Sequence, residues 1–505
     1  MQSQVSELAS IIRIFEYMSF TFIMVIGFVI LSIIVMYISD VTQTSQAIRK
    51  NYPVVGRFRY FFEKMGEFFR QYFFAMDREE MPFNRAIRSW VYRAAKDLEN
   101  TTAFGSTRDL KPENTILFVN TAFPTLSQDA KTTRDIVIGE NCKKPYHTQK
   151  IFHISGMSYG AISKPAVRSL SLGAKMAGCW MNTGEGGLSP YHLEGGADLI
   201  FQIGTAKYGI RNQNGEICKE KLVELGELEQ VKMIEIKLSQ GAKPGKGGIL
   251  PGTKVTKEIA EIRGIAMGSD SISPNRHPDI KCTKDLLDFI ELVRNTTGKP
   301  VGFKAVVGDY NWFNELLEEI NRRGTDSAPD FITIDSADGG TGAAPLSLMD
   351  YMGLPISESL PRVNDLICKY KLRDRIKLIA SGKLITPAEV AWALCVGADF
   401  VVSARGFMFS LGCIQAMQCN KNTCPTGITT HKKHLQKGLH VRHKSVRVAN
   451  YARNMEKELA VIAHACGVQE PRELDRTHAR LVIKNGQSIS LAEAYRSNKT
   501  NDYNI

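Results

Sequence analysis

Short apolar runs alternate with amphipathic stretches over much of this chain, and this pattern limits its possible folds more than any other feature. The alternation begins near Lys111 and continues for more than about 250 residues without an obvious linker. Runs typical of buried strands lie at Ile151–Ile154, Val231–Ile236, Val301–Val307, Phe331–Asp335, Ile376–Ala380 and Phe400–Ala404. Helical patterns lie between them, at Thr283–Asn295, Asn314–Arg323 and Thr386–Val396. Because the alternation is so long, we expect an α/β fold, a (β/α)8 TIM barrel with its helices outside a parallel sheet.

Glycine-rich junctions follow the strands on one side. They span residues 156–160, 182–187, 240–248, 338–342, 381–383 and 404–406. In a barrel, the loops after the strands build the active site, and glycine lets backbone N–H groups approach a ligand closely. One such segment could be only a tight turn, but six predict a ligand site. The expected ligand-binding residues of these junctions include Gly156, Asp338, Gly339, Gly340, Gly382 and Ala404.

The last two junctions indicate what kind of ligand the site holds. One apolar run leads into Ser381-Gly382-Lys383, and the next leads into Ala404-Arg405-Gly406. Loops after strands seven and eight of a barrel commonly bind a phosphate, and Arg405 would neutralise its charge. Flavin mononucleotide (FMN) is therefore the leading candidate. A dinucleotide domain would need G-x-G-x-x-G between a strand and a helix, and we find no such element.

Lys304 stands inside the otherwise apolar run Val301–Val307. A lysine that points into a barrel needs an anionic partner, which the electron-rich edge of a reduced flavin would supply. The alternative is a lysine at the end of the strand that reaches solvent.

Three of the ten cysteines cluster as Cys413-x5-Cys419-x4-Cys424-Pro425. Clustered thiolates in a cytoplasmic protein favour a metal over a disulfide. Zinc usually takes four ligands from paired C-x2-C turns, which this spacing lacks, so an iron–sulfur cluster fits better. A three-iron cluster suits three ligands, whereas a four-iron cluster would need a fourth, non-cysteine ligand. The remaining alternative is three free cysteines in a core.

The first 45 residues predict a membrane anchor. No charged residue occurs from Tyr17 to Ser39. The apolar stretch Phe20–Ile38 is close to the length of about 20 residues that crosses a bilayer as a helix. A buried core helix is the alternative. Basic residues dominate after this segment, so the part that follows it should be cytoplasmic.

The next region is basic and rich in aromatic residues. Residues 49–96 carry eleven basic and five acidic side chains, which is half of the chain's net charge of +12. Such a mixture could bind single-stranded nucleic acid, contact anionic lipids, or pack on the main domain. Because it directly follows the predicted membrane helix, we expect lipid contact or packing and no nucleic acid.

Several segments resemble the flavin- and cluster-binding barrel of glutamate synthase, from about Ile151 to Gly427. They are GMSYGAISKPA, NTGEGG, KLSQGAKPGKGGILPG, DGGTGAAPL, LRDRIKLIASGKL and LGCIQAMQCNKNTCPTG. The segments NYPVVGRFRYFFEKMGEFFRQYF and PFNRAIRSWVYRAAK are similar to those of smaller, stand-alone FMN-binding proteins of this type from bacteria.

The resemblance implies FMN, a [3Fe–4S] cluster on Cys413, Cys419 and Cys424, and reductive amination. In that reaction 2-oxoglutarate and ammonia form 2-iminoglutarate, which accepts a hydride from reduced FMN to give L-glutamate. Glu185 and Lys304 would be catalytic, and Glu185 and Lys243 would contact the substrate. The residues expected to contact FMN by resemblance are Met157, Ser158, Asn182, Gln240, Lys304, Gly382, Lys383 and Arg405.

This chain also departs from the large enzyme. It opens Met1-Gln2-Ser3 instead of with a glutaminase cysteine, and Ala337 stands where the family has a histidine before Asp-Gly-Gly. Lys383 and Arg405 replace residues expected to be uncharged. Ammonia should therefore come from outside the chain, and electrons from a separate reductase subunit or a ferredoxin.

Two alternatives stay open: an amine-transferring enzyme like N-methylglutamate synthase, and a membrane-anchored redox relay without substrate turnover. The expected organisation is a transmembrane anchor at 1–45, a basic helical region at 46–110, the barrel at 111–430 and a helical tail with a loop-rich end at 431–505. The expected location is a bacterial inner membrane, crossed once.

Overall fold

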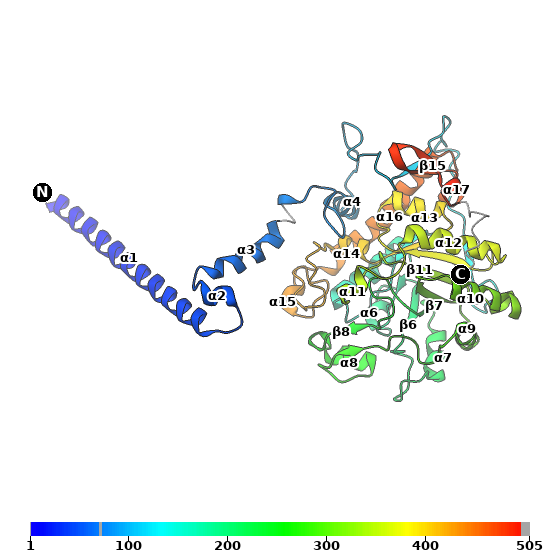
Figure 1. Cartoon of the computed structure of the whole chain (residues 1–505), viewed down its shortest axis with the longest axis horizontal. Coiled ribbons are helices and arrows are strands. Elements are labelled where there is room, and N and C mark those ends of the chain that lie inside the picture. The colour runs from blue at the N-terminus through cyan, green and yellow to red at the C-terminus, as the bar shows by residue number, and fades with distance from the viewer. Residues whose placement is uncertain (1, 70–72, 496–505) are drawn as a thin grey trace. The chain divides into compact units, whose positions relative to one another are not determined.

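The structure is a computed structural model that describes residues 2–69 and 73–495. The expected loop-rich end at residues 496–505 lies outside the described residues. The chain forms two compact units, Met1–Ala86 and Ile87–Ile505, which are described separately (Figure 1).

The N-terminal unit consists mainly of three helices. They are α1 (Gln2–Thr42), α2 (Ala47–Asn51) and α3 (Gly56–Phe69). Within α1, residues Ser10–Thr42 form one helix that is long and apolar enough to cross a membrane. The apolar helix expected from the sequence is therefore confirmed, whereas its insertion in a membrane stays a prediction.

Eight parallel strands in the second unit close into a barrel, as the sequence predicted. In order around the barrel they are β4 (Phe152–Ile154), β5 (Met181–Asn182), β6 (Leu199–Ile203), β7 (Val231–Lys237), β10 (Val301–Val306), β11 (Phe331–Asp335), β12 (Lys377–Ser381) and β13 (Phe400–Ser403). The barrel closes where Val401–Ser403 pair with Phe152–Ile154. The sequence identified six of these strands. It missed β5, which has only two residues, and β6, which follows a short helix instead of a full one.

Helices cover the outside of the barrel (Figure 1). The predicted ones form as α9 (Thr283–Thr297), α10 (Asn311–Arg323) and α13 (Pro387–Cys395), and a capping box of Thr386 and Glu389 starts α13. The others that follow barrel strands are α5 (Lys164–Ala177), α6 (Pro190–Leu193), α7 (Lys219–Glu227), α11 (Leu346–Met349), α12 (Ile356–Lys369) and α14 (Arg405–Leu411). Helices α9 and α10 each bury one apolar stripe, whereas α13 is buried over most of its length.

A long excursion leaves the barrel after β7. It contains β8 (Ile249–Leu250), the 3-10 turn η2 (Gly252–Lys254), α8 (Lys257–Arg263) and β9 (Ser271–Ile272), and β8 pairs with β9. Because parallel strands all end at the same edge, this excursion starts at the same end of the barrel as the glycine-rich loops.

A buried apolar cluster closes the opposite end of the barrel. The hairpin of β2 (Ile136–Ile138) and β3 (Tyr146–Thr148) contributes Ile138 and Tyr146 to a buried cluster with Trp180 and the barrel residues Phe331 and Phe400. A ligand site is therefore expected at the other end.

The C-terminal region is part of the same unit. It contains α15 (Lys433–Gln436), α16 (Val441–Ala465), β14 (Ala479–Val482), β15 (Ser488–Ser490) and α17 (Leu491–Ala494). The long helix α16 packs on α5, α13 and α14. Strand β14 pairs with β1 (Ile116–Phe118) and with β15, so the tail holds strands as well as the expected helix. Residues 87–95 of α4 (Arg85–Ala95) also reach α16, where Trp90 donates to the carboxylate of Glu458 (3.2 Å).

Candidate functional site

The carboxyl ends of the barrel strands carry polar side chains, in contrast to the apolar closed end. A buried carboxylate, Glu235 of β7, is at the centre of this group. Its oxygens accept hydrogen bonds from Asn182 Nδ2 (2.8 Å), Gln202 Nε2 (2.6 Å) and Thr333 Oγ1 (2.6 Å). Donors from three other strands satisfy the hydrogen-bonding capacity of this carboxylate. Its burial in the barrel interior therefore leaves no unpaired acceptor.

Glu185 lies just above this layer and pairs with a lysine. Lys237 Nζ donates to Glu185 Oε1 at 2.6 Å and also to the amide oxygen of Gln240. Burial alone would raise the pKa of Glu185, but the nearby cations, with Lys237 the strongest of them, together lower it. Burial lowers the pKa of Lys237, and Glu185 opposes that change. Glu185 therefore carries its negative charge within the barrel mouth.

Glu185 is also closely enclosed by backbone. A Cβ on Gly204 would stand 2.6 Å from Glu185 Cβ, and one on Gly248 would stand 2.4 Å from Glu185 Oε1. Only glycine allows two chain segments to pass so near this carboxylate. Gly248, in the glycine-rich segment 240–248, thus lies directly against a predicted catalytic residue.

Lys304 points into the barrel, as the sequence predicted, and has an anionic partner. Its Nζ lies 3.8 Å from Asp335 Oδ2 at the end of β11, and both side chains are buried. Asp335 also accepts a hydrogen bond from the Gly241 amide (2.9 Å). The partner identified is thus a carboxylate of this chain, and contact of Lys304 with a flavin stays a prediction.

Two basic side chains of the last two junctions converge on Asp338. Lys383 Nζ lies 4.0 Å from Asp338 Oδ1, and the Arg405 guanidinium donates to the Asp338 carbonyl. Burial lowers the pKa of Arg405 to about 10, while Asp335 and Asp338 oppose that change. A Cβ on Gly340 would stand 2.8 Å from Arg405 Nε. Cationic groups beside backbone without side chains form a cradle of the kind that binds phosphate, so these residues fit the phosphate of FMN.

The loop after β4 lies against this layer. A Cβ on Gly156 would stand 2.9 Å from Asn182 Oδ1, and one on Gly184 would stand 2.6 Å from the Ser158 amide nitrogen. The structure therefore brings Gly156, Met157 and Ser158 together with Asn182, as expected for one ligand site.

Two further buried cations act on Glu185. Lys243 donates to the Ala343 carbonyl (3.1 Å) and so joins the loop after β7 to the loop after β11. Arg263, at the end of α8, donates to Ser271 Oγ (3.0 Å) and Ser158 Oγ (3.4 Å), and its Nε is buried without a partner among the described residues. The charges of Lys243 and Arg263 both lower the pKa of Glu185. These two cations and the Glu185–Lys237 pair give this end of the barrel a net positive charge, which suits an anionic substrate.

The loop that carries the three cysteines reaches the same end of the barrel. Lys254 of η2 donates to the carbonyls of Ala161 (2.6 Å) and Cys419 (3.3 Å). His431 Nε2 contacts the Gly160 carbonyl at 2.9 Å, and Tyr92 of α4 donates to the Cys413 carbonyl at 2.6 Å. The cysteine loop is thus held next to the loop of Met157 and Ser158.

The three thiols lie close enough to act on one another. Burial, with the neighbouring Cys419 and Cys424 thiols adding to it, raises the pKa of Cys413 to about 12. Among residues 2–69 and 73–495, no group of three or more His, Cys, Asp or Glu side chains is arranged to hold a single metal ion. A single ion needs all its ligands about 2.3 Å from one point, whereas in a three-iron cluster each thiolate binds a different iron. Three thiols on one loop therefore fit such a cluster as a donor set.

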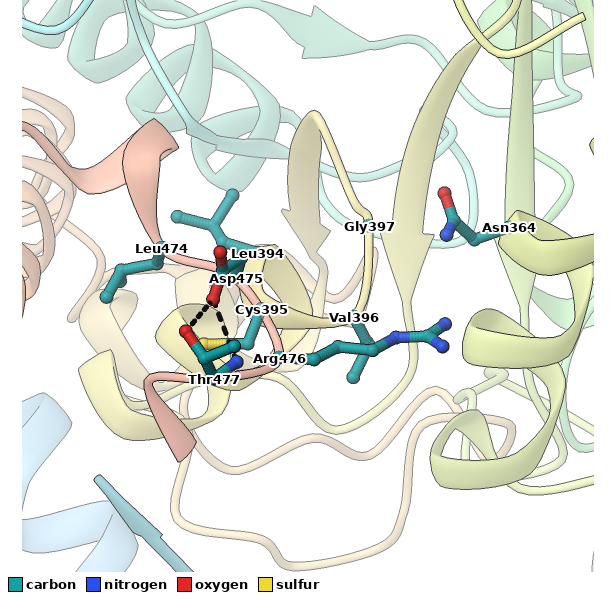
Figure 2. A pocket seen from close by; sticks show the side chains of 9 residues that line it. All are labelled: Asn364, Leu394, Cys395, Val396, Gly397, Leu474, Asp475, Arg476 and Thr477. Carbon is teal, nitrogen blue, oxygen red and sulfur yellow. Dashed lines mark hydrogen bonds between the residues drawn. The ribbon is translucent and has the colours of Figure 1, made fainter. Parts of the chain in front are cut away.

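A surface hollow far from this end of the barrel is not part of the candidate site. Figure 2 shows it between Asn364, the end of α13 at Leu394–Gly397, and Leu474–Thr477. Its polar groups are satisfied locally: Thr477 Oγ1 donates to Asp475 (2.5 Å), and Arg476 pairs with Asp365 (2.6 Å).

Sequence reasoning missed several residues of the barrel mouth. Glu235 and Lys237 share the apolar run of β7, so the signal that identified Lys304 was present there too. Gln202 lies on a strand that was not predicted, and Arg263 lies on a helix outside the barrel order, where no pattern indicated its role.

Comparison with known proteins agrees with this architecture. Residues 91–469 match the family model for the conserved region in glutamate synthase. The glutamate synthase large subunit-like protein YerD of Bacillus subtilis is 40% identical over 510 residues, which cover 92% of this chain and 96% of that protein. The archaeal glutamate synthase (NADPH) of Methanocaldococcus jannaschii is 36% identical over 331 residues, 65% of this chain and 61% of that protein.

Among solved structures, a mandelate oxidase superposes with a TM-score of 0.45 at 15% identity, covering 78% of this chain and 98% of that one. That likeness is too distant to support a functional argument. The family match covers most of the chain and includes every barrel strand, so this protein belongs to the glutamate synthase family.

Proposed function

We propose that the protein is an FMN- and iron–sulfur-dependent oxidoreductase that forms L-glutamate by reductive amination of 2-oxoglutarate, with ammonia from outside this chain. The observation that carries the proposal is the charged barrel mouth. There Glu185–Lys237 and Lys304–Asp335 lie beneath glycine-rich loops, next to a loop with three cysteines.

Different residues of the barrel mouth would bind the cofactor and the substrate. Lys383, Arg405 and the backbone of Gly339, Gly340 and Gly382 would hold the FMN phosphate, and Lys304 would face the flavin ring. Gly156, Met157, Ser158, Asn182, Gln240, Asp338 and Ala404 complete the proposed cofactor site. Bound FMN would supply a hydride to the carbon that becomes the α-carbon of glutamate, and a cluster on Cys413, Cys419 and Cys424 would supply electrons one at a time.

The substrate would lie between the cations and Glu185. Lys243 and Arg263 are buried cations whose charges reach Glu185, so they are suited to the carboxylates of 2-oxoglutarate. The ionised Glu185 would orient ammonia and accept a proton as the carbon–nitrogen bond forms. Its burial between Gly204 and Gly248 restricts the space for water around it.

The electrons would come from a separate reductase subunit or a ferredoxin. We further propose that α1 crosses a bacterial inner membrane once and that the barrel is cytoplasmic. In this arrangement residues 1–45 form the anchor, 46–110 a basic helical region, 111–430 the catalytic barrel and 431–505 the tail.

Anaerobic titration tests the proposed reaction. The flavin is photoreduced in the purified full-length chain, and 2-oxoglutarate is then added alone, with ammonium, or with methylamine. Flavin reoxidation and L-glutamate formation only with ammonium would support the proposal. Reoxidation with methylamine and formation of N-methylglutamate would favour the amine-transferring alternative, and no reoxidation under any condition would favour the relay.

A further inference from the structure

Asp40, in the last turn of α1, joins that helix to the two that follow it. Its carboxylate is fully buried and accepts hydrogen bonds from Arg49 Nη2 (2.5 Å), Arg57 Nε (2.8 Å) and the Val54 amide (3.0 Å). Arg57 also lies 3.5 Å from the Met36 carbonyl of α1. A buried carboxylate favours keeping both guanidinium partners, because each lost pair leaves its charge less compensated for burial. The start of α3 is therefore held at the end of α1.

Helix α3 has one apolar face. Phe58, Phe61, Phe62 and Met65 follow one another at three- and four-residue spacing, which places them on the same side of the helix. Arg59, Tyr60, Glu63 and Lys64 occupy the other side.

This face is solvent-exposed in the structure. The side chains of Phe58, Phe61 and Phe62 are 58%, 54% and 63% exposed, and the rings of Phe61 and Phe62 pack on each other with centroids 5.4 Å apart. Three adjacent exposed phenylalanines are far more apolar surface than a short helix in water usually shows.

We propose that α3 lies in the headgroup region of the bilayer that α1 spans, with Phe58, Phe61 and Phe62 at the boundary of the acyl chains. This rests on the proposed insertion of α1. The Asp40 pairs bring α3 to the end of the span, which is where the bilayer surface would be. Aromatic side chains favour that boundary, and Arg59 and Lys64 on the opposite side suit anionic headgroups. The lipid surface would therefore be a second membrane contact besides α1.

Photocrosslinking in the full-length chain tests this placement. Benzoylphenylalanine replaces Phe62 on the apolar face or, as a matched aromatic control, Tyr60 on the polar face. Both proteins are expressed in bacterial membranes, irradiated and analysed by mass spectrometry of the peptide that covers α3. We expect the phospholipid adduct at position 62 to exceed that at position 60 by about fivefold or more.

Two outcomes would overturn the placement of α3. One is crosslinking of position 62 to the barrel unit, to a second copy or to another protein in place of lipid, and the other is equal lipid adduct at both positions. Alkaline carbonate extraction of the same membranes reports on α1 separately. A chain that resists extraction but gives no lipid adduct at position 62 would disprove the placement of α3 alone. A chain that carbonate extracts would disprove the α1 anchor, and the placement of α3 with it.

Discussion

Two buried lysines at opposite ends of β10 show how position determines the role of a residue. Lys304 lies near the barrel mouth beside Asp335, and Lys299 lies before the strand, where its Nζ donates to the carbonyls of Leu228 (2.6 Å) and Val231. Both are buried, but only Lys304 interrupts an apolar run, whereas Lys299 stands between Gly298 and Pro300. Of the two, only Lys304 lies at the end of the barrel where we propose the ligand site.

Replacing each lysine by methionine should separate these roles. Lys304→Met should lower the flavin content of the purified protein and slow flavin reoxidation by 2-oxoglutarate and ammonium by about tenfold or more. Lys299→Met should leave the flavin content unchanged and lower the free energy of unfolding by about 1–3 kcal/mol, because two carbonyls lose the hydrogen bond from the Lys299 ammonium. Flavin absorbance per chain and urea unfolding measure the two effects. Normal flavin content and turnover in Lys304→Met would remove Lys304 from the site.

Lys243 should give the reaction an alkaline limit. Burial, with the Lys237 charge added, lowers its pKa from 10.5 to about 8. Above pH 8 the ammonium loses its proton and no longer attracts a carboxylate, so kcat/KM for 2-oxoglutarate should fall about tenfold per pH unit. Lys243→Arg should remove this decline, because a guanidinium stays charged. A flat profile of the native protein from pH 8 to 10 would contradict the role of Lys243.

The lowered pKa of Lys243 also makes the stability of the fold depend on pH. The folded-state pKa of Lys243 lies below the unfolded value of 10.5, so the unfolded chain binds the extra proton between about pH 8 and 10.5. The contribution of this residue to the free energy of unfolding therefore rises with pH through that window.

At the scale of elements, the cysteine loop depends on neighbours from distant parts of the chain. Lys254, His431 and Tyr92 all hold its backbone or the loop beside it. The spacing of the three cysteines was visible in the sequence, whereas the contact with the loop of Met157 and Ser158 was not, because barrel closure brings those segments together.

Substituting one cysteine should show whether the loop binds iron. Cys419→Ser should lose most of the iron, sulfide and visible absorbance of the anaerobically purified chain, because serine is a poor replacement for a thiolate ligand. Cys466→Ser is the matched control, since Cys466 is a buried cysteine outside the loop, near His478. Unchanged iron in Cys419→Ser would show that these cysteines do not bind a cluster.

The link between α1 and α3 can be tested with two arginines of one helix. Arg57 pairs with Asp40 (2.8 Å), and Arg59 lies on the exposed polar side. Arg57→Gln should reduce the lipid adduct at position 62 severalfold, because Asp40 then holds only Arg49, whereas Arg59→Gln should keep most of it. Both variants should resist carbonate extraction. Equal adducts in the two variants would show that the Asp40 pairs do not position α3.

At the scale of the whole molecule, the tail is part of the barrel unit. Glu456 of α16 accepts hydrogen bonds from the amides of Ile151 (2.8 Å) and Phe152 (3.2 Å), and the Tyr451 ring packs on Phe152 and Phe407. The barrel and tail, expected as separate regions, therefore share one core.

Removing the tail should unfold the barrel. A chain that ends at residue 430 would expose Phe152 and Phe407. It would also leave the amides of Ile151 and Phe152 without their acceptor, and the total cost would be several kcal/mol. We expect aggregation of this truncated chain, in contrast to a normal thermal unfolding transition of the full-length chain. A soluble, flavin-binding chain that ends at residue 430 would contradict the shared core.

Local signals in the sequence were sufficient to predict the barrel class, six of its strands and the apolar N-terminal helix. They also identified the glycine-rich loops and the three-cysteine spacing. Each of these depends on neighbouring residues, because periodicity and spacing are local properties. The tertiary structure decided which charges meet: Glu185 with Lys237, Lys304 with Asp335, and Arg57 with Asp40. Partners such as Glu185 and Lys237 are far apart in the chain, and only the closing of the barrel brings their loops to one end.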